Sequence, residues 1–171
     1  MVFLVILVVG GAARAQTPVT GEWSLPNLSP ASTRAMAGSQ ITAGRVGRLR
    51  VLWRFRLRRS AVAEPGQSPE ALRGLVATPI VAGDTVYIQD STSSVYALGL
   101  ASGVLRWVHR FRADNFGRNG LSYSSGSIYG STDTTVFALS AATGHMLWQR
   151  TLVSPSELFV DIAPLIANNL V

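Results

Sequence analysis

The stretch Ala138–Trp148 (ALSAATGHMLW) repeats an earlier stretch of the chain, Ala97–Trp107 (ALGLASGVLRW). Three landmarks recur at one spacing of 41 residues: Ala97, Gly103 and Trp107 in the first copy, and Ala138, Gly144 and Trp148 in the second. Each copy follows residues such as Val, Tyr, Phe and Thr, which favour β-strands. Each glycine follows Ser or Thr, a combination typical of tight turns. The chain therefore contains at least two copies of one β-rich structural unit.

Further matches extend this repeat in both directions. Val86–Ile88 is predicted to correspond to Ser127–Tyr129 at the same offset, and Ala163–Val171 resembles Thr78–Val86, as the start of a third copy. A period of about 40–45 residues, with four short strands in each unit, is typical of a β-propeller. We therefore predict an all-β protein, a β-propeller with four-stranded blades of about 41 residues, of which about two and a half blades are present.

The N-terminus has the pattern of an export signal. Val2–Val9 (VFLVILVV) is a continuous apolar run, and Ala13-Arg14-Ala15 after it has the small residues that signal peptidase requires. The run is shorter than the roughly 20 residues that a membrane-spanning helix needs. We predict a signal peptide over residues 1–15 and a secreted or periplasmic protein with no transmembrane span after cleavage. The alternative is a buried strand or helix at the start of the chain.

Three further segments are predicted after the signal peptide: residues 16–60 as an N-terminal segment ending in an outer strand, 61–75 as a linker loop, and 76–171 as the partial propeller. The strand is expected over 48–58, where apolar residues alternate with arginines. The arginine row allows two interpretations, a stripe that binds a polyanion or a solvated strand face. Charge on such a face also protects a strand edge from aggregation, and this second interpretation is the preferred one.

Composition excludes several classes of function. The chain has 171 residues, of which 47% are hydrophobic and 14% charged, which is incompatible with a disordered protein. It has no cysteine, so disulfides, thiolate catalysis and cysteine-based zinc sites are excluded within it. The net charge is +6, and every one of the basic residues is arginine, but no nucleic-acid-binding motif accompanies that charge, so no nucleic-acid partner is expected.

Histidine and aspartate residues are the remaining candidates for metal chemistry. His109 and His145 fit no metal-binding spacing and are predicted to be surface strand residues. Asp90 and Asp133 fall in corresponding loops between strands. One interpretation is a calcium or axial-channel role, and the preferred one is that they cap turns by accepting hydrogen bonds from nearby backbone N–H groups.

Both copies of the repeat, Ala97–Trp107 and Ala138–Trp148, resemble the Ala-x-Asp-x-x-Thr-Gly-x-x-x-Trp motif of pyrroloquinoline-quinone (PQQ) type propellers, the quinoprotein alcohol dehydrogenase-like family. The usual Asp is replaced by Gly99 and by Ser140. The segment before the first blade is also similar to that family at Trp23, Asn27, Thr33, Arg34, Ile41, Val46, Leu49 and Trp53, so the resemblance covers roughly residues 20–171. It implies that Trp107 and Trp148 dock between blades and that Gly103 and Gly144 lie at tight turns.

The resemblance implies two classes of function. Family dehydrogenases hold PQQ and a calcium ion on the propeller axis. Asn119-Gly120 is predicted to be a turn, and because a nearby Asn-x-Gly segment of the family lies close to the quinone, the resemblance makes Asn119 a candidate cofactor contact. Other relatives are non-catalytic, such as an outer-membrane assembly lipoprotein. The chain departs from the dehydrogenases because Leu75–Thr78 contains no quinone-contacting Glu and Arg112–Gly117 contains no cysteine pair. The sequence therefore favours an exported binding or scaffold module for a small molecule or a protein; the alternative is the N-terminal part of a PQQ-dependent alcohol or sugar dehydrogenase.

Overall fold

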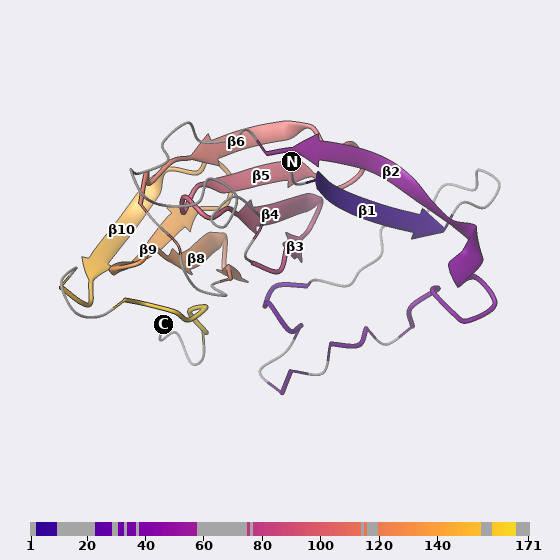
Figure 1. The fold of residues 1–171 in the computed structure, drawn as a ribbon, viewed down its shortest axis with the longest axis horizontal. Helices are drawn as coiled ribbons and strands as arrows, with labels where there is room; N and C mark the ends of the chain where they lie inside the picture. Colours follow the sequence, from indigo (N-terminus) through magenta and orange to yellow (C-terminus); the bar gives the residue numbers. More distant parts are fainter. Residues whose placement is uncertain are drawn as a thin grey trace, which may run out of the picture.

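The computed structural model describes most of the repeat region and parts of the segment before it. It describes residues 3–9 (backbone only), 23–28, 31–32, 34–36, 38–57, 75, 77–113, 115, 120–154 and 159–166. These residues form ten strands and one short 3-10 helix (Figure 1). No helix among them is both long and apolar enough to cross a membrane.

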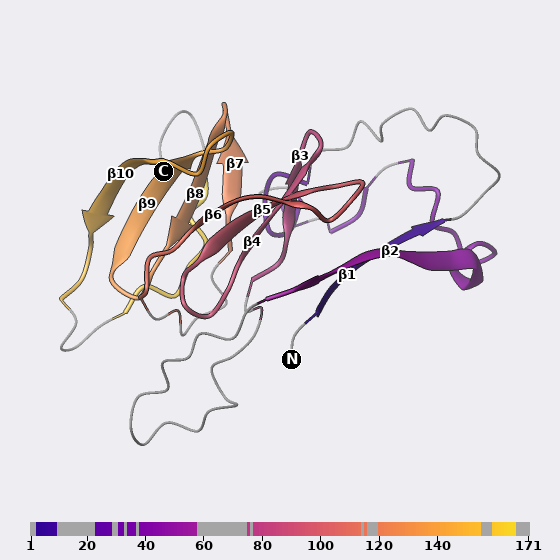
Figure 2. The same ribbon diagram turned by 90° about the horizontal axis from the view of Figure 1, so that it is seen from above.

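Eight of the strands form two antiparallel four-stranded sheets that lie next to each other (Figures 1 and 2). The first sheet has the order β3 (Ile80–Ala82), β4 (Thr85–Gln89), β5 (Val95–Gly99) and β6 (Leu105–His109). The second has the order β7 (Ser122–Ser124), β8 (Ser127–Ser131), β9 (Thr135–Ser140) and β10 (Met146–Thr151). Two successive four-stranded meanders are two blades of a propeller, which confirms the predicted fold class.

One detail of the predicted repeat is wrong by one residue. Tyr87 pairs with Ala97 across the first sheet, whereas Tyr129 pairs with Ala138 across the second. Tyr87 therefore corresponds to Tyr129, and the predicted match of Val86–Ile88 with Ser127–Tyr129 slips by one position. The cause is the loop between the second and third strands, which is one residue shorter in the second blade.

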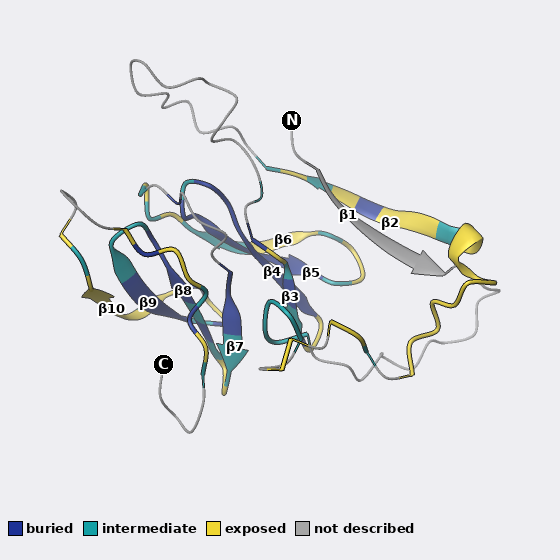
Figure 3. Ribbon diagram, turned by 60° about the horizontal axis from the view of Figure 1, so that its bottom comes forward, coloured by how far each residue is buried: buried dark blue, intermediate teal, exposed yellow. Residues whose placement is uncertain are grey.

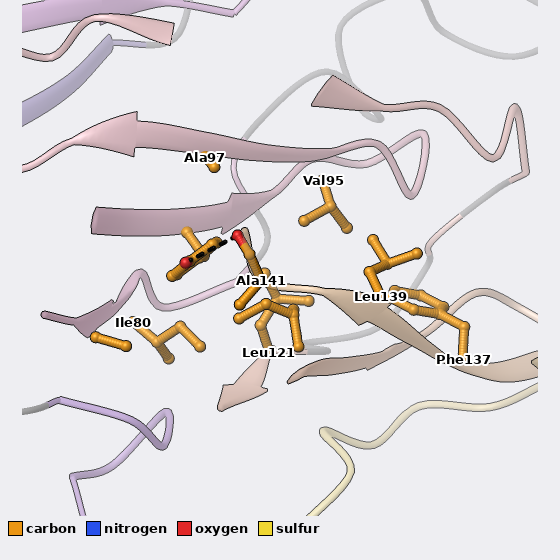
Figure 4. Packing of buried hydrophobic residues seen from close by; sticks show 10 residues of the cluster. Ile80, Val95, Ala97, Leu121, Phe137, Leu139 and Ala141 are labelled. Atoms are coloured by element: carbon orange, nitrogen blue, oxygen red, sulfur yellow. Dashed lines mark hydrogen bonds between the residues drawn. The ribbon is translucent and has the colours of Figure 1, made fainter. Parts of the chain in front are cut away.

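The main core lies between the two blades. Side chains from the facing surfaces of both sheets pack together there. The packing is close beside Gly130 of the second blade, where an added Cβ would lie 2.5 Å from Phe137. The buried members of this cluster are Ile80, Ala82, Tyr87, Val95, Ala97, Leu121, Ile128, Phe137, Leu139 and Ala141 (Figure 4). A fully buried aliphatic or aromatic side chain stabilises a fold by about 1.5–3 kcal/mol, so this interface holds the two blades in a fixed relation.

A second, smaller cluster covers the other face of the first sheet. It joins Val86, Ile88, Tyr96 and Leu98 to Trp53 on β2 (Leu49–Arg56), which follows the 3-10 helix η1 (Val46–Arg48). The strand predicted over 48–58 is therefore present as β2. Figure 3 shows this strand exposed over most of its length with one buried position, and that position is Trp53.

Strand β2 pairs antiparallel with β1 (Phe3–Val9). The apolar run predicted to be the core of a signal peptide thus lies in this strand, while residues 10–22, which include the predicted cleavage site, lie outside the described part. Leu52, which interrupts the alternation of β2, sits at an irregularity where Ile6 and Leu7 face Trp53 and Val51. Arg50 and Arg54 on either side of it are exposed.

The segment before the blades crosses the start of both. Trp23 pairs with Val81 of β3 through two backbone hydrogen bonds of 2.9 and 2.8 Å, and the Tyr123 amide of β7 donates to the Ser24 carbonyl at 2.8 Å. At the other end of the chain, residues 159–166 pass along the second blade. Of the predicted third repeat, residues 163–166 are described and form no strand.

Candidate functional site: the seam between the blades

Trp107, on the outer strand of the first blade, docks onto the second blade. Its indole Nε1 donates a hydrogen bond of 2.9 Å to the Ala141 carbonyl. The ring lies against Gly144, where an added Cβ would be 2.5 Å from Trp107 Cε3, and Gly144 has a φ of 72°. Glycine suits this position for two reasons, since only it adopts such a φ without strain and only it leaves room for the indole. The tryptophan of one copy of the repeat thus contacts the glycine of the next copy.

Trp53 makes the same contact one blade earlier. Its Nε1 donates to the Leu100 carbonyl at 2.8 Å, and a Cβ at Gly103, where φ is 67°, would lie 2.5 Å from the indole. Leu100 and Gly103 occupy the positions in the first blade that Ala141 and Gly144 occupy in the second. Strand β2 is therefore related to the first blade as β6 is related to the second.

The alanines of the repeat face the tryptophans across the sheet. Ala97 pairs with Trp107 and Ala138 with Trp148, and both alanines are fully buried. A small side chain opposite an indole leaves the ring free to lean toward the next blade. Trp148 itself is 38% exposed and lies 6.2 Å, between ring centroids, from Tyr129 of its own blade.

His109 also lies in the seam, the contact between the facing surfaces of the two blades. Its Nδ1 lies 2.9 Å from the Gly144 carbonyl, and its ring is 4.6 Å, between centroids, from that of Phe111. The prediction of surface strand residues is therefore correct only in part for each histidine. His109 ends strand β6 but is half-buried between the blades, and His145 is exposed but precedes β10. Among the described residues, no group of three or more His, Cys, Asp or Glu side chains is placed to hold a metal ion.

A cleft of about 380 Å³ opens at one end of the seam. The turn between β3 and β4 lines it with Asp84, and Arg106 of β6 reaches across to this carboxylate with hydrogen bonds of 2.7 and 2.5 Å. The Arg106 guanidinium lowers the pKa of Asp84 to about 2. Tyr87, which also lines the cleft, donates from its hydroxyl to the Ala141 carbonyl at 3.2 Å, and its burial raises its pKa.

The loop that follows β4, at the opposite end of the first blade, carries a buried polar network. Asp90 follows β4 and accepts four hydrogen bonds: its Oδ1 takes the Thr92 amide (2.9 Å), the Thr92 hydroxyl (2.8 Å) and the Ser94 amide (2.9 Å), and its Oδ2 takes the Tyr96 hydroxyl (2.8 Å). Burial and the neighbouring Asp90 carboxylate raise the pKa of Tyr96 well above its usual range. The carboxylate is fully engaged in holding this loop, so Asp90 acts as a turn cap.

Gln89, beside Asp90, links the two blades at this polar end. The side chain is fully buried, and its Nε2 donates to the Ser131 carbonyl at 2.7 Å. Its Oε1 has no hydrogen-bond partner among the described residues. Other buried polar side chains gather on the loops at this end: Ser91, Ser93, Ser94, Asn115 and Thr132.

Sequence reasoning did not single out Gln89, Tyr87 or the Asp84–Arg106 pair. Gln89 and Tyr87 lie within strands, where nothing in the repeat pattern marks them as contacts between blades. Asn119, the one residue that the resemblance assigned to cofactor binding, lies outside the described residues.

Two stacked four-stranded meanders, joined by a tryptophan from the outer strand of the first, define the class of PQQ-repeat β-propellers. The family model for the β-propeller domain of glucose, ethanol and alcohol dehydrogenases (PQQ) matches residues 23–144. The chain belongs to this family.

Known dehydrogenases show how similar the chain is to its relatives in sequence and structure. The chain is 31% identical over 142 residues to the lanthanide-dependent methanol dehydrogenase of Methylacidiphilum fumariolicum, covering 75% of this chain and 21% of that protein. A europium-containing methanol dehydrogenase structure matches with a TM-score of 0.69 and 30% identity, over 86% of this chain and 26% of that one. The quinohemoprotein alcohol dehydrogenase of Comamonas testosteroni matches with a TM-score of 0.71 and 26% identity, over 87% and 22%. The chain thus spans between a fifth and about a quarter of these relatives.

Proposed function

We propose that this chain supplies the first blades of the propeller of an exported quinone-dependent alcohol dehydrogenase. The observation that carries the proposal is the family match over residues 23–144, together with 30–31% identity to methanol dehydrogenases over three quarters or more of the chain. The seam supports it physically, because the tryptophan contacts fix one blade relative to the next. A rigid ring is what holds a cofactor in one orientation toward its substrate.

The polar end of the seam is the part of the chain that fits a role beside the cofactor. It offers buried neutral hydrogen-bonding groups, and the Gln89 Oε1 has no partner among the described residues. PQQ, when bound, supplies the chemistry by accepting a hydride equivalent from the alcohol. The described residues hold no cluster of metal ligands for a calcium or lanthanide ion. Their proposed role is to position the cofactor and to exclude water from it. Asn119 is the proposed contact with the quinone.

The test is reconstitution of the protein encoded by the longest reading frame that contains residues 1–171. The purified protein is mixed with PQQ and either Ca²⁺ or La³⁺, freed of excess cofactor, and assayed for dye reduction with methanol, ethanol and 1-butanol. The proposal predicts retained quinone absorbance and alcohol-dependent reduction. Asn119→Ala is expected to weaken quinone retention, whereas Gln149→Ala, on an exposed position of β10, is the matched control.

A second candidate is a non-catalytic binding or scaffold module. The observation in its favour is the stretch Leu75–Thr78, which has no carboxylate where the dehydrogenases of the family carry a quinone-contacting Glu. A folded protein that retains no quinone with either metal would overturn the dehydrogenase proposal and leave this one.

Export is proposed from the N-terminal pattern. Secreted or periplasmic protein is expected to begin at Gln16, after removal of residues 1–15. N-terminal sequencing of the periplasmic fraction tests this. Protein that keeps Met1 and stays in the cytoplasm would contradict it.

A further inference from the structure

The pairing of β1 with β2 reproduces the pairing of the third and fourth strands in each blade. In the first blade Trp107 faces Ala97 and Leu105 faces Leu98, so one residue of the outer strand is skipped. In the second blade Trp148 faces Ala138 and Met146 faces Leu139, with the same skip. Beside β2, Trp53 faces Ile6 and Val51 faces Leu7, again with one residue skipped.

The three pairs therefore share a direction, a register relative to the tryptophan and the position of one bulge. A bulge is a local feature that fixes register, because a slip of one residue would turn every side chain to the other face. Two strands that met only through general hydrophobic attraction would have no reason to repeat the bulge at the residue before the tryptophan. β1 thus occupies the place of a third blade strand.

Strand β2 needs such a partner. Its tryptophan contacts Leu100 and Gly103 as Trp107 contacts Ala141 and Gly144, so β2 is the outer strand of a blade that precedes the first one. An outer strand without a third strand has one edge of unpaired backbone N–H and C=O groups, which is unfavourable in water and a site of aggregation. Figures 1 and 2 both show β1 lying along β2.

We propose that the edge of β2 is a binding site for a third blade strand, and that the chain's own segment Phe3–Val9 occupies this site before the N-terminus is processed. The segment covers the edge and holds Trp53 against the first blade. If residues 1–15 are removed on export, as proposed above, the edge opens to a third strand from elsewhere in the propeller. Only this last step rests on the proposed export.

The strand pairing is testable with engineered cysteines, because the chain contains none. Val5 faces Arg54 in the observed register. The pair Val5→Cys with Arg54→Cys is expected to form a disulfide on mild oxidation of the full chain, since facing residues lie within the roughly 4.4–6.8 Å between Cα atoms that a disulfide needs. Disulfide formation is read by non-reducing gel shift and by mass spectrometry of the linked peptides.

Two control pairs make the result decisive. Val5→Cys with Arg50→Cys is out of register, because Arg50 faces Val8; about 3.3 Å per residue along a strand puts these two positions beyond reach. Thr135→Cys with Thr151→Cys tests the equivalent strands of the second blade. The proposal predicts at least a fivefold higher yield for the in-register pair than for the out-of-register pair, and a yield comparable to that of the blade pair.

Equal yields for the in-register and out-of-register pairs, or no disulfide at the in-register pair while the blade pair forms one, would overturn the proposal. So would failure of all three pairs, since the blade pairing itself would then be absent. Export is measured separately by the start of the mature protein, so retention of residues 1–15 in exported protein would refute the opening of the edge and leave the strand pairing standing.

Discussion

Gly144→Ala is expected to weaken the contact between the blades, because it adds one methyl group where the Trp107 indole lies. The new Cβ would be 2.5 Å from Cε3, 2.7 Å from Cδ2 and 3.0 Å from Cζ3 of that ring. The ring cannot move away without weakening the Nε1 hydrogen bond to Ala141. Gly126→Ala is the matched control, because Gly126 also has a positive φ, of 79°, but has nothing within 4 Å of the added methyl.

The two substitutions share one cost and differ in another. An alanine held at positive φ costs about 1–2 kcal/mol, and this applies to both positions. Forcing an extra methyl into a packed contact costs a further ~1–3 kcal/mol, and this applies to Gly144 alone. We therefore expect the free energy of unfolding to fall by about 1 kcal/mol for Gly126→Ala and by about 3 kcal/mol for Gly144→Ala.

Guanidinium unfolding, followed by tryptophan fluorescence and far-UV circular dichroism, measures the difference. We expect a lower unfolding midpoint for Gly144→Ala than for Gly126→Ala, at a similar slope. Equal losses at the two positions would argue against a steric contact at Gly144, because the backbone cost alone would then explain both.

Three further predictions concern single side chains. Trp107→Ala is expected to lower the free energy of unfolding by about 2–4 kcal/mol. Trp148→Ala, which removes a more exposed ring, should lower it by about 1 kcal/mol or less. Equal losses in the same unfolding assay would count against the docking contact. Asp90→Ala removes the acceptor of four hydrogen bonds and should cost about 2–3 kcal/mol, and a loss below about 0.5 kcal/mol would argue against the capping role. The pKa of Asp84 is lowered from 3.8 to about 2, so its pair with Arg106 stabilises the folded state above pH 3.8 and this contribution disappears as the pH falls through 2. The difference in melting temperature between the unmodified chain and Asp84→Asn should accordingly be small, since the pair is exposed, and should vanish toward pH 2; a difference that grows on acidification would contradict the sign.

The repeat made the fold predictable. The landmarks that recur at a spacing of 41 residues are those with the strictest steric demands: an alanine opposite an indole, a glycine beneath one, and the indole itself. Such demands leave little choice of residue type, so they are visible in one sequence. The register of the second strands was predicted wrongly because a loop of one residue less leaves no trace in the composition of the strands it joins.

The candidate site was less predictable. Gln89 ends a strand in which it directly follows Val86, Tyr87 and Ile88. Only the neighbouring blade, through the Ser131 carbonyl, explains a buried amide there. The partners of His109 and Arg106 likewise depend on how strands that are distant in the sequence stack or pair. Contacts of this kind follow from the arrangement of the blades, so they can be read only once that arrangement is known.

The ¹H NMR shift of the glycine α-protons tests directly whether successive blades dock through a tryptophan on a turn glycine. An aromatic ring stacked on a glycine shifts those protons strongly upfield. The docking geometry predicts upfield-shifted α-protons for Gly144 and Gly103. The Gly144 shift should be lost in Trp107→Ala and the Gly103 shift in Trp53→Ala. Ordinary shifts at both glycines in the folded chain, or shifts that survive these substitutions, would contradict this docking.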